Sequence, residues 1–210
     1  MAPSSGKARP IIGGSETQAQ PYHARVLLND KGMCTSTLVA SRYILTAKHC
    51  VDTPGNYTFR IGSTYAESGG TVAAAARITL HPSADLAMVR LDQQVGNAPA
   101  RLAAGSPQVG SNVSIYGWGA TCRGNEGACQ SPVLKTATMR MTGFGQDHSG
   151  GTALQLQHLN GVAAGGDSGG PAMVAGSVVG VASTSNRQTV SSYTATATYA
   201  DWIRTQAANG

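Results

Sequence analysis

The sequence predicts an all-β fold: two packed six-stranded antiparallel β-barrels followed by a short C-terminal α-helix. The 210-residue chain has 27 glycines and only 5% aromatic residues, which suits short strands joined by glycine turns better than long helices. Its apolar runs are short, are separated by turn residues and fall into two series. The chain is long enough for one or two well-packed cores.

The first series of apolar runs is rich in Val, Ile, Tyr and Thr, and its runs have the length of strands. We expect strands at 26–28, 36–39, 43–45, 57–61, 71–78 and 86–91. Residues 94–110 are rich in Gly, Pro and Ala and have no clear period. They mark the domain boundary, so we expect an N-terminal barrel over residues 11–100.

The second series has the same character and follows this boundary. We expect its strands at 113–116, 134–141, 153–156, 171–174, 178–182 and 193–197. Tyr199, Trp202 and Ile203 recur at helical spacing, which predicts one helix at 199–207. The expected C-terminal barrel therefore covers residues 101–210 and includes this helix.

A serine stands among glycines in the segment Gly-Asp-Ser-Gly-Gly-Pro at 166–171. Glycines let the backbone approach a substrate carbonyl closely and offer N–H donors to it. The pattern around Ser168 also fits the nucleophile elbow of α/β-hydrolases, in which the base histidine follows the serine. All five histidines precede Ser168, which excludes that arrangement and leaves the order His, Asp, Ser.

Two upstream segments fit this order. His49 precedes a cysteine at the end of one apolar run, and Asp85 stands at the head of another. The chain also has Ile-Ile-Gly-Gly at 11–14 and Gly-Trp-Gly at 117–119. Together with the serine turn, these segments resemble the signature segments of the trypsin/chymotrypsin family of serine peptidases, from residue 11 to about residue 204.

The resemblance implies that Ser168 is the nucleophile, that His49 acts as general base and then general acid, and that Asp85 orients the His49 ring. The backbone N–H groups of Gly166 and Ser168 would form the oxyanion hole. The remaining histidines are expected at the surface or in loops: His23, His81, His148 and His158.

The resemblance also implies activation by cleavage. Residues 1–10 are polar and lack the apolar core of a signal peptide, so we interpret them as an initiator Met with a short propeptide. Cleavage before Ile11 would free an ammonium that pairs with the carboxylate of Asp167 and orders the serine turn. The family places a basic residue directly before the new N-terminus, whereas here Pro10 intervenes after Arg9. The activating peptidase stays open, and the intact chain could be a zymogen.

Specificity is expected to come from residues near the nucleophile. By resemblance, Val162 lies at the base of the primary pocket, where trypsin-like members have an aspartate, so cleavage after Arg or Lys is not expected. Ser185 and Ser191 replace glycines of the pocket walls, and Ala164 replaces a cysteine of the disulfide that usually braces one wall. We expect an elastase-like preference for Ala, Val or Leu. Further expected substrate-binding residues are Ala163, Ser183 and Thr184.

Four cysteines indicate two disulfides and an oxidising, extracellular setting, with four reduced thiols as the alternative. The resemblance pairs Cys34 with Cys50, and Cys122 with Cys129 would staple a glycine-rich loop. We therefore expect a secreted, monomeric enzyme that acts on proteins or peptides and could meet proteinaceous inhibitors. The excess of Arg over Lys and the abundant alanine are typical of a high-GC bacterium, which suggests an actinobacterial source.

The sequence leaves other function classes open. Poly(L-lactide) is an alternative substrate, because its lactate unit is an ester isostere of alanine and some actinobacterial relatives degrade it. An inactive homologue that serves as a binding module is less favoured, since all three triad residues are present. The net charge of +5 is scattered without a basic stripe for nucleic acid, and no apolar run approaches membrane-span length. We expect no cofactor and no metal, because loop 62–70 has a single carboxylate, Glu67.

Overall fold

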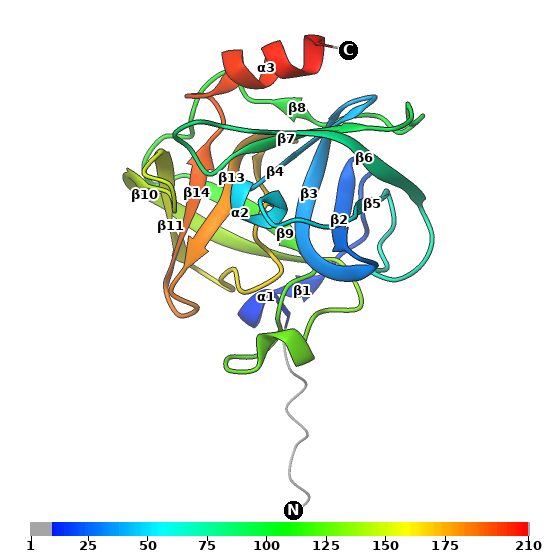
Figure 1. The fold of residues 1–210 in the computed structure, drawn as a ribbon. Helices are drawn as coiled ribbons and strands as arrows, with labels where there is room; N and C mark the ends of the chain where they lie inside the picture. The colour runs from blue at the N-terminus through cyan, green and yellow to red at the C-terminus, as the bar shows by residue number, and fades with distance from the viewer. Residues whose placement is uncertain (1–9, 210) are drawn as a thin grey trace, which may run out of the picture.

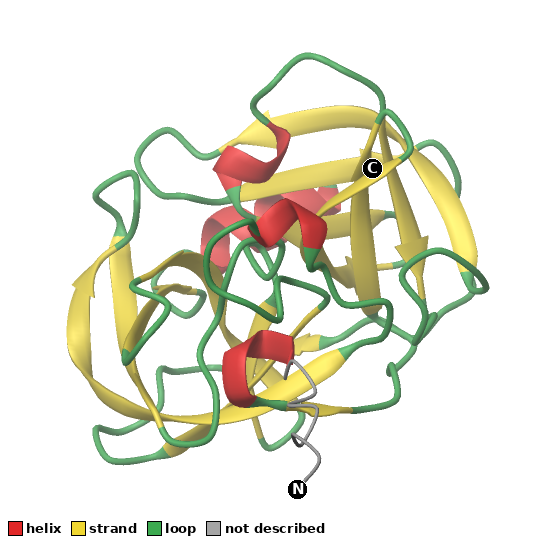
Figure 2. Ribbon diagram, turned by 90° about the horizontal axis from the view of Figure 1, so that it is seen from below, coloured by secondary structure: helices red, strands yellow, loops and turns green. Residues whose placement is uncertain are grey.

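The computed structural model describes residues 10–209. Two β-barrels lie against each other, and the helices are few and short (Figure 1). Viewed from below, the strands form two groups, with loops and short helical turns between them (Figure 2). The expected propeptide, residues 1–10, lies outside the described residues except for Pro10.

The first barrel is closed by six strands in the order β2-β3-β4-β7-β6-β5, with every neighbouring pair antiparallel. These strands are β2 (His23–Leu28), β3 (Lys31–Ala40), β4 (Tyr43–Thr46), β5 (Tyr57–Ile61), β6 (Thr71–Leu80) and β7 (Ala87–Leu91). The side chains of β5 alternate: Tyr57, Phe59 and Ile61 are buried, and Thr58 and Arg60 are half-buried. This period of two is what directs one face of each strand into the barrel.

The second barrel closes through six further strands in the order β9-β10-β11-β14-β13-β12, because β12 and β10 both pair with β9. These strands are β9 (Asn112–Gly117), β10 (Lys135–Gln146), β11 (Thr152–His158), β12 (Pro171–Val174), β13 (Ser177–Ser185) and β14 (Val190–Ala195). Two short strands, β1 (Ser15–Glu16) and β8 (Arg101–Leu102), attach to β10 and β13. The predicted fold class is confirmed.

Both ends of the described chain reach across the expected division at residue 100. The C-terminal helix α3 (Ala200–Ala208) buries Ile203 in the core of the first barrel and contacts β7. It lies across one end of that barrel in Figure 1. Near the N-terminus, α1 (Pro10–Gly13) and β1 contact β10 of the second barrel. Each barrel is therefore completed by a segment from the other half of the sequence.

The turn that carries Ser168 sits where the two barrels meet. Its carbonyl oxygen accepts a hydrogen bond from the backbone N–H of Thr35 in β3, with an N···O distance of 2.9 Å. Gly169 follows with a φ of +83°, and a Cβ there would collide with the carbonyl oxygen of Thr35 and the hydroxyl of Thr46. Only glycine allows this close approach.

Both expected disulfides are present, Cys34–Cys50 and Cys122–Cys129. The first joins β3 to the helical turn α2 (Lys48–Val51), and the second closes a loop that contains the 3-10 turn η1 (Glu126–Ala128). Neither turn was predicted from the sequence.

Removing each disulfide tests how it stabilises the chain. Because a cross-link restricts the unfolded chain more when its loop is longer, the Cys34→Ala/Cys50→Ala variant should lose about 3 kcal/mol of unfolding free energy. The Cys122→Ala/Cys129→Ala variant should lose about 2 kcal/mol. The sequence separations are 16 and 7 residues. Urea unfolding followed by tryptophan fluorescence measures both values, and the opposite ranking would contradict this account.

Candidate active site

His49 and Asp85 are brought together by strand pairing in the first barrel. Thr46 at the end of β4 pairs with Ala87 at the start of β7, so the residues just beyond these ends are neighbours. Nδ1 of His49 lies 2.7 Å from Oδ2 of Asp85, and the backbone N–H of His49 donates to Oδ1 at 3.0 Å. The carboxylate therefore fixes both the backbone and the ring of His49, and directs Nε2 away from itself.

The carboxylate of Asp85 is fully buried and also accepts a hydrogen bond from Oγ of Ser183 in β13, at 2.6 Å. Burial acts to raise the pKa of Asp85, but the hydrogen bonds from His49 and Ser183 outweigh it and the net shift is downward. Asp85 therefore stays ionised and holds the His49 ring with its Nδ1 proton facing the carboxylate.

A second buried carboxylate, Asp147, binds the backbone of Asp85. Its Oδ2 accepts hydrogen bonds from the backbone N–H of Asp85 and the hydroxyl of Thr194, both at 2.8 Å. Its Oδ1 accepts the N–H groups of Ser149 at 2.9 Å and Gly151 at 2.7 Å. The sequence indicates a turn at Asp147, because an aspartate can bond the N–H two positions on, but a solvated turn residue was expected and Asp147 is buried.

The half-buried Ser168 lies beside the His49 segment. Its carbonyl oxygen is 3.5 Å from Sγ of Cys50, the residue that follows His49. The backbone N–H groups of Gly166 and Ser168 donate to no other residue in the part of the chain that the structure describes. Gly166 has a φ of +96°, and a Cβ there would collide with Oε1 of Gln130. The turn thus presents a hydroxyl and two free donors, which suits an anionic intermediate.

Asp167, between these two residues, is completely buried. Its carboxylate accepts hydrogen bonds from the backbone N–H groups of Gly119 at 2.8 Å and Ala164 at 2.9 Å. Burial raises the pKa of Asp167 to about 7. Ile11 is also fully buried, in the core of the second barrel, and Ile12 forms a backbone bridge with Val162. In the intact chain the Ile11 nitrogen belongs to a peptide bond and carries no charge.

A small pocket with a volume of about 30 Å³ opens beside Ser168. Its lining residues are Ala163, Ala164, Ser168, Ala182, Ser183, Thr184, Ser185 and Arg187. Two residues expected in the pocket do not line it. The side chain of Val162 is buried in the core of the second barrel, and Ser191 is buried in β14. The backbone of Val162 pairs with Ile12, and Ser191 lies opposite Leu156 of β11.

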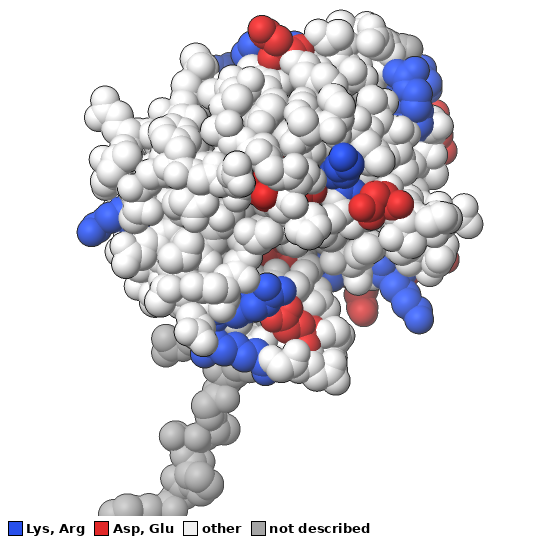
Figure 3. Space-filling model, turned by 60° about the vertical axis from the view of Figure 1, so that its left-hand side comes forward, with Lys and Arg blue, Asp and Glu red and all other residues white. Residues whose placement is uncertain are grey.

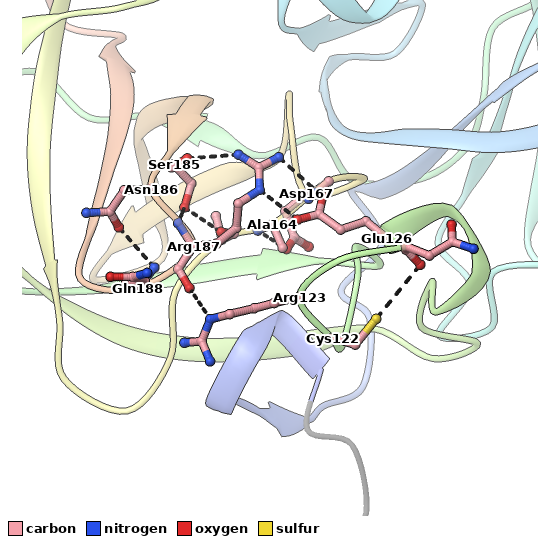
Figure 4. A network of polar contacts seen from close by, with 12 residues as sticks. Cys122, Arg123, Glu126, Ala164, Asp167, Ser185, Asn186, Arg187 and Gln188 are labelled. Atoms are coloured by element: carbon pink, nitrogen blue, oxygen red, sulfur yellow. Dashed lines mark hydrogen bonds and ion pairs between the residues drawn. The ribbon is translucent and has the colours of Figure 1, made fainter.

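Arg187 was not expected in this pocket, and it forms a two-point ion pair with Glu126 of η1 (Figure 4). Its Nε lies 2.7 Å from Oε1 and its Nη2 lies 3.2 Å from Oε2 of Glu126. The hydrogen bonds from Arg187 lower the pKa of the Glu126 carboxyl. The ion pair joins two loops that are far apart in the sequence. Predicting it would require knowing that these loops lie opposite each other, and the sequence does not show this.

One of the other histidines departs from the expected surface or loop position, and a second is buried within a loop. His23 is fully buried in β2, where its Nδ1 accepts the backbone N–H of Gln20 at 3.0 Å and burial lowers its pKa to about 4. His81 packs edge-on against Tyr199 and Trp202. His148 and His158 are exposed, as expected.

The charged side chains on one face of the molecule are scattered. On the face in Figure 3, Lys and Arg form small separate groups. Within residues 10–209, no group of three or more His, Cys, Asp or Glu side chains is arranged to hold a metal ion. In the same residues, no helix has the length and apolar character needed to span a membrane.

Comparisons with known proteins show the family of the chain. The model of the trypsin family matches residues 11–203. The chain is 31% identical to alkaline trypsin A of Manduca sexta, over 92% of this chain and 90% of that protein. It is 29% identical to an uncharacterized peptidase of Corynebacterium glutamicum, over 93% of this chain and 70% of that protein.

A solved structure of neuropsin, a serine protease expressed in the limbic system of mouse brain, superposes with a TM-score of 0.81. It covers 93% of this chain and 99% of the neuropsin chain, and at 24% identity it supports the fold. The predicted resemblance is confirmed, and the chain belongs to the trypsin family of serine proteases.

Proposed function

We propose that the chain is a secreted, monomeric serine endopeptidase that uses Ser168, His49 and Asp85 as its catalytic triad. The observation that carries this proposal is the pairing of the His49 ring with the buried Asp85 carboxylate beside the serine turn. Secretion is supported by the two disulfides, which persist in oxidising compartments.

In the proposed reaction, Oγ of Ser168 attacks the carbonyl carbon of the scissile peptide while Nε2 of His49 takes the hydroxyl proton. The N–H groups of Gly166 and Ser168 stabilise the oxyanion of the tetrahedral intermediate. His49 then gives its proton to the leaving amine, and an acyl-enzyme remains. Water attacks the ester carbonyl carbon while His49 takes its proton. The ester bond to Oγ then breaks, the carboxylic acid product leaves, and His49 returns the proton to Ser168.

The pocket supports a preference for small or medium uncharged side chains at the cleaved position. Three alanines line it, and no carboxylate is among the lining residues. Cleavage after Lys or Arg, as in trypsins, would need such a carboxylate. Hydrolysis of poly(L-lactide) stays a prediction from the sequence alone.

A peptide panel tests the proposal. A chain that starts at Ile11 should cleave chromogenic peptides after Ala, Val or Leu, and the rate should fall by a factor of at least about 10⁴ in Ser168→Ala, because the nucleophile is lost. His49→Ala should lose a similar factor. Initial rates at pH 8 give both values. Equal turnover by Ser168→Ala, or selective turnover after Arg, would contradict the proposal.

Activation rests on Asp167 and Ile11. Within the described residues the fully buried carboxylate accepts two backbone N–H groups, and although the charge of Arg25 favours its ionised form, burial outweighs this. A free ammonium at Ile11 would supply a direct ion-pair partner. Cleavage before Ile11 would therefore stabilise the turn that carries Gly166 and Ser168.

The pH dependence of stability tests this pairing. In the intact chain, burial raises the folded-state pKa of Asp167 from its ordinary value of 3.8 to about 7. The folded state then binds more protons than the unfolded state in this window, so stability should fall as pH rises from about 4 to 7. In the chain that starts at Ile11, the ammonium should lower the pKa of Asp167, so stability should no longer fall over this pH range.

The measurement is urea unfolding of both chains between pH 4 and 8, in a Ser168→Ala background that prevents self-cleavage. The stability advantage of the chain that starts at Ile11 should grow over this range. Parallel pH profiles for the two chains would argue against the pairing of Ile11 with Asp167.

A further inference from the structure

We propose that Arg187, held in place by Glu126, closes the primary pocket and restricts it to side chains of about the size of alanine. This inference rests on the proposed peptidase function and narrows its substrate class. The size of the side chain that the pocket accepts is then limited by an ion pair, and neither of its two residues was expected in the pocket from the sequence.

The first support is the position of Arg187 in the pocket wall. It lines the pocket together with Ser185, and its side chain folds back over its own loop. Its Nη1 donates to the carbonyl oxygen of Ser185 at 2.8 Å, and its backbone N–H donates to Oγ of Ser185 at 2.9 Å. Oγ of Ser185 in turn donates to the carbonyl oxygen of Ala163 on the opposite wall, at 2.6 Å. The guanidinium therefore binds Ser185 as well as Glu126.

The second support is that Glu126 anchors the pair to the serine turn. Its Oε2 accepts the backbone N–H of Gly165 at 2.7 Å, three residues before Ser168, while both carboxylate oxygens bind Arg187. Figure 4 shows the guanidinium spanning from Ser185 to Glu126. The ion pair thus links the two walls of the pocket, where Ala164 replaces the first cysteine of the bracing disulfide expected in the family.

These bonds limit the size of the bound side chain. A volume of about 30 Å³ has room for a group about as large as one water molecule, such as a methyl group. A leucine or phenylalanine side chain would have to displace Arg187 and break two-point, charge-assisted hydrogen bonds. Such bonds are among the stronger polar contacts in proteins. Alanine should therefore be preferred over leucine.

The pair also keeps the pocket electrically neutral. Neutralising Glu126 would leave a guanidinium unpaired at the pocket wall, and this cation would attract an acidic side chain of the substrate. A purely structural brace would not produce such a charge preference. This difference separates a specificity role from a role in loop stability.

The experiment compares Arg187→Ala, Arg187→Met and Glu126→Gln with the unmodified chain starting at Ile11. The substrates are peptides that differ only at the cleaved residue: Ala, Leu, Phe, Glu or Lys. Arg204→Ala is the matched control, because Arg204 is an exposed arginine in α3 with only a 4.0 Å contact to Asp201. Active enzyme is counted in each sample by titration with a fluorophosphonate.

The expected result is a change in ratios of kcat/KM within each variant. Both Arg187 variants should raise the Leu-to-Ala ratio at least tenfold, since neither side chain can bind Glu126. Glu126→Gln should raise the Glu-to-Ala ratio at least tenfold, and Arg204→Ala should keep the ratios of the unmodified chain.

The outcomes separate the two proposals. One outcome is that the unmodified chain reacts with the fluorophosphonate and cleaves after Ala while neither Arg187→Met nor Glu126→Gln changes the kcat/KM ratios. In that case the role of Arg187 is overturned and the peptidase function stands. If the unmodified chain neither reacts with the fluorophosphonate nor cleaves any peptide, the proposed function itself fails. Should Arg187→Ala fold poorly, Arg187→Met and Glu126→Gln decide, because their ratios are independent of the amount of active protein.

Discussion

The site depends on the docking of one glycine-rich turn from the second barrel onto the first. Ser168 is bound through its carbonyl oxygen to β3, and Gly169 lies so close to Thr35 and Thr46 that no side chain fits. The residues on the two sides of this contact come from separate barrels. The packing of the barrels therefore sets the position of the serine relative to the His49 segment, and a shift between barrels would disturb the chemistry directly.

Three buried aspartates around this contact are stabilised in different ways. Asp85 is held by side-chain hydrogen bonds that keep its pKa low, and Asp147 by three backbone N–H groups and Thr194. Asp167 has two backbone donors, and burial raises its pKa to about 7. A buried charge without compensation is costly. The negative charge of Asp85, which orients His49, is thus well stabilised. The negative charge of Asp167, where the new N-terminal ammonium would bind, is poorly stabilised.

The disulfide-closed loop 122–129 supports the serine turn from outside. Glu126 binds the N–H of Gly165, and Gln130, just after the loop, donates its Nε2 to the carbonyl oxygen of Gly165 at 2.8 Å. The buried Arg25 donates to Oε1 of Gln130 at 3.0 Å. The loop therefore couples the first barrel, the serine turn and the pocket wall at Arg187 through polar contacts.

Twelve barrel strands, the terminal helix, the serine turn and the family can all be predicted from the chain, because strand alternation, glycine turns and motif order are properties of local sequence. Only the tertiary structure placed Val162 in the core and Arg187 in the pocket, since the direction of a side chain depends on which strand its backbone pairs with. The Arg187–Glu126 pair joins residues 61 positions apart, and the Asp85–Asp147 contact joins residues 62 positions apart. Such contacts exist only after both barrels have closed, so no local pattern in the chain encodes them.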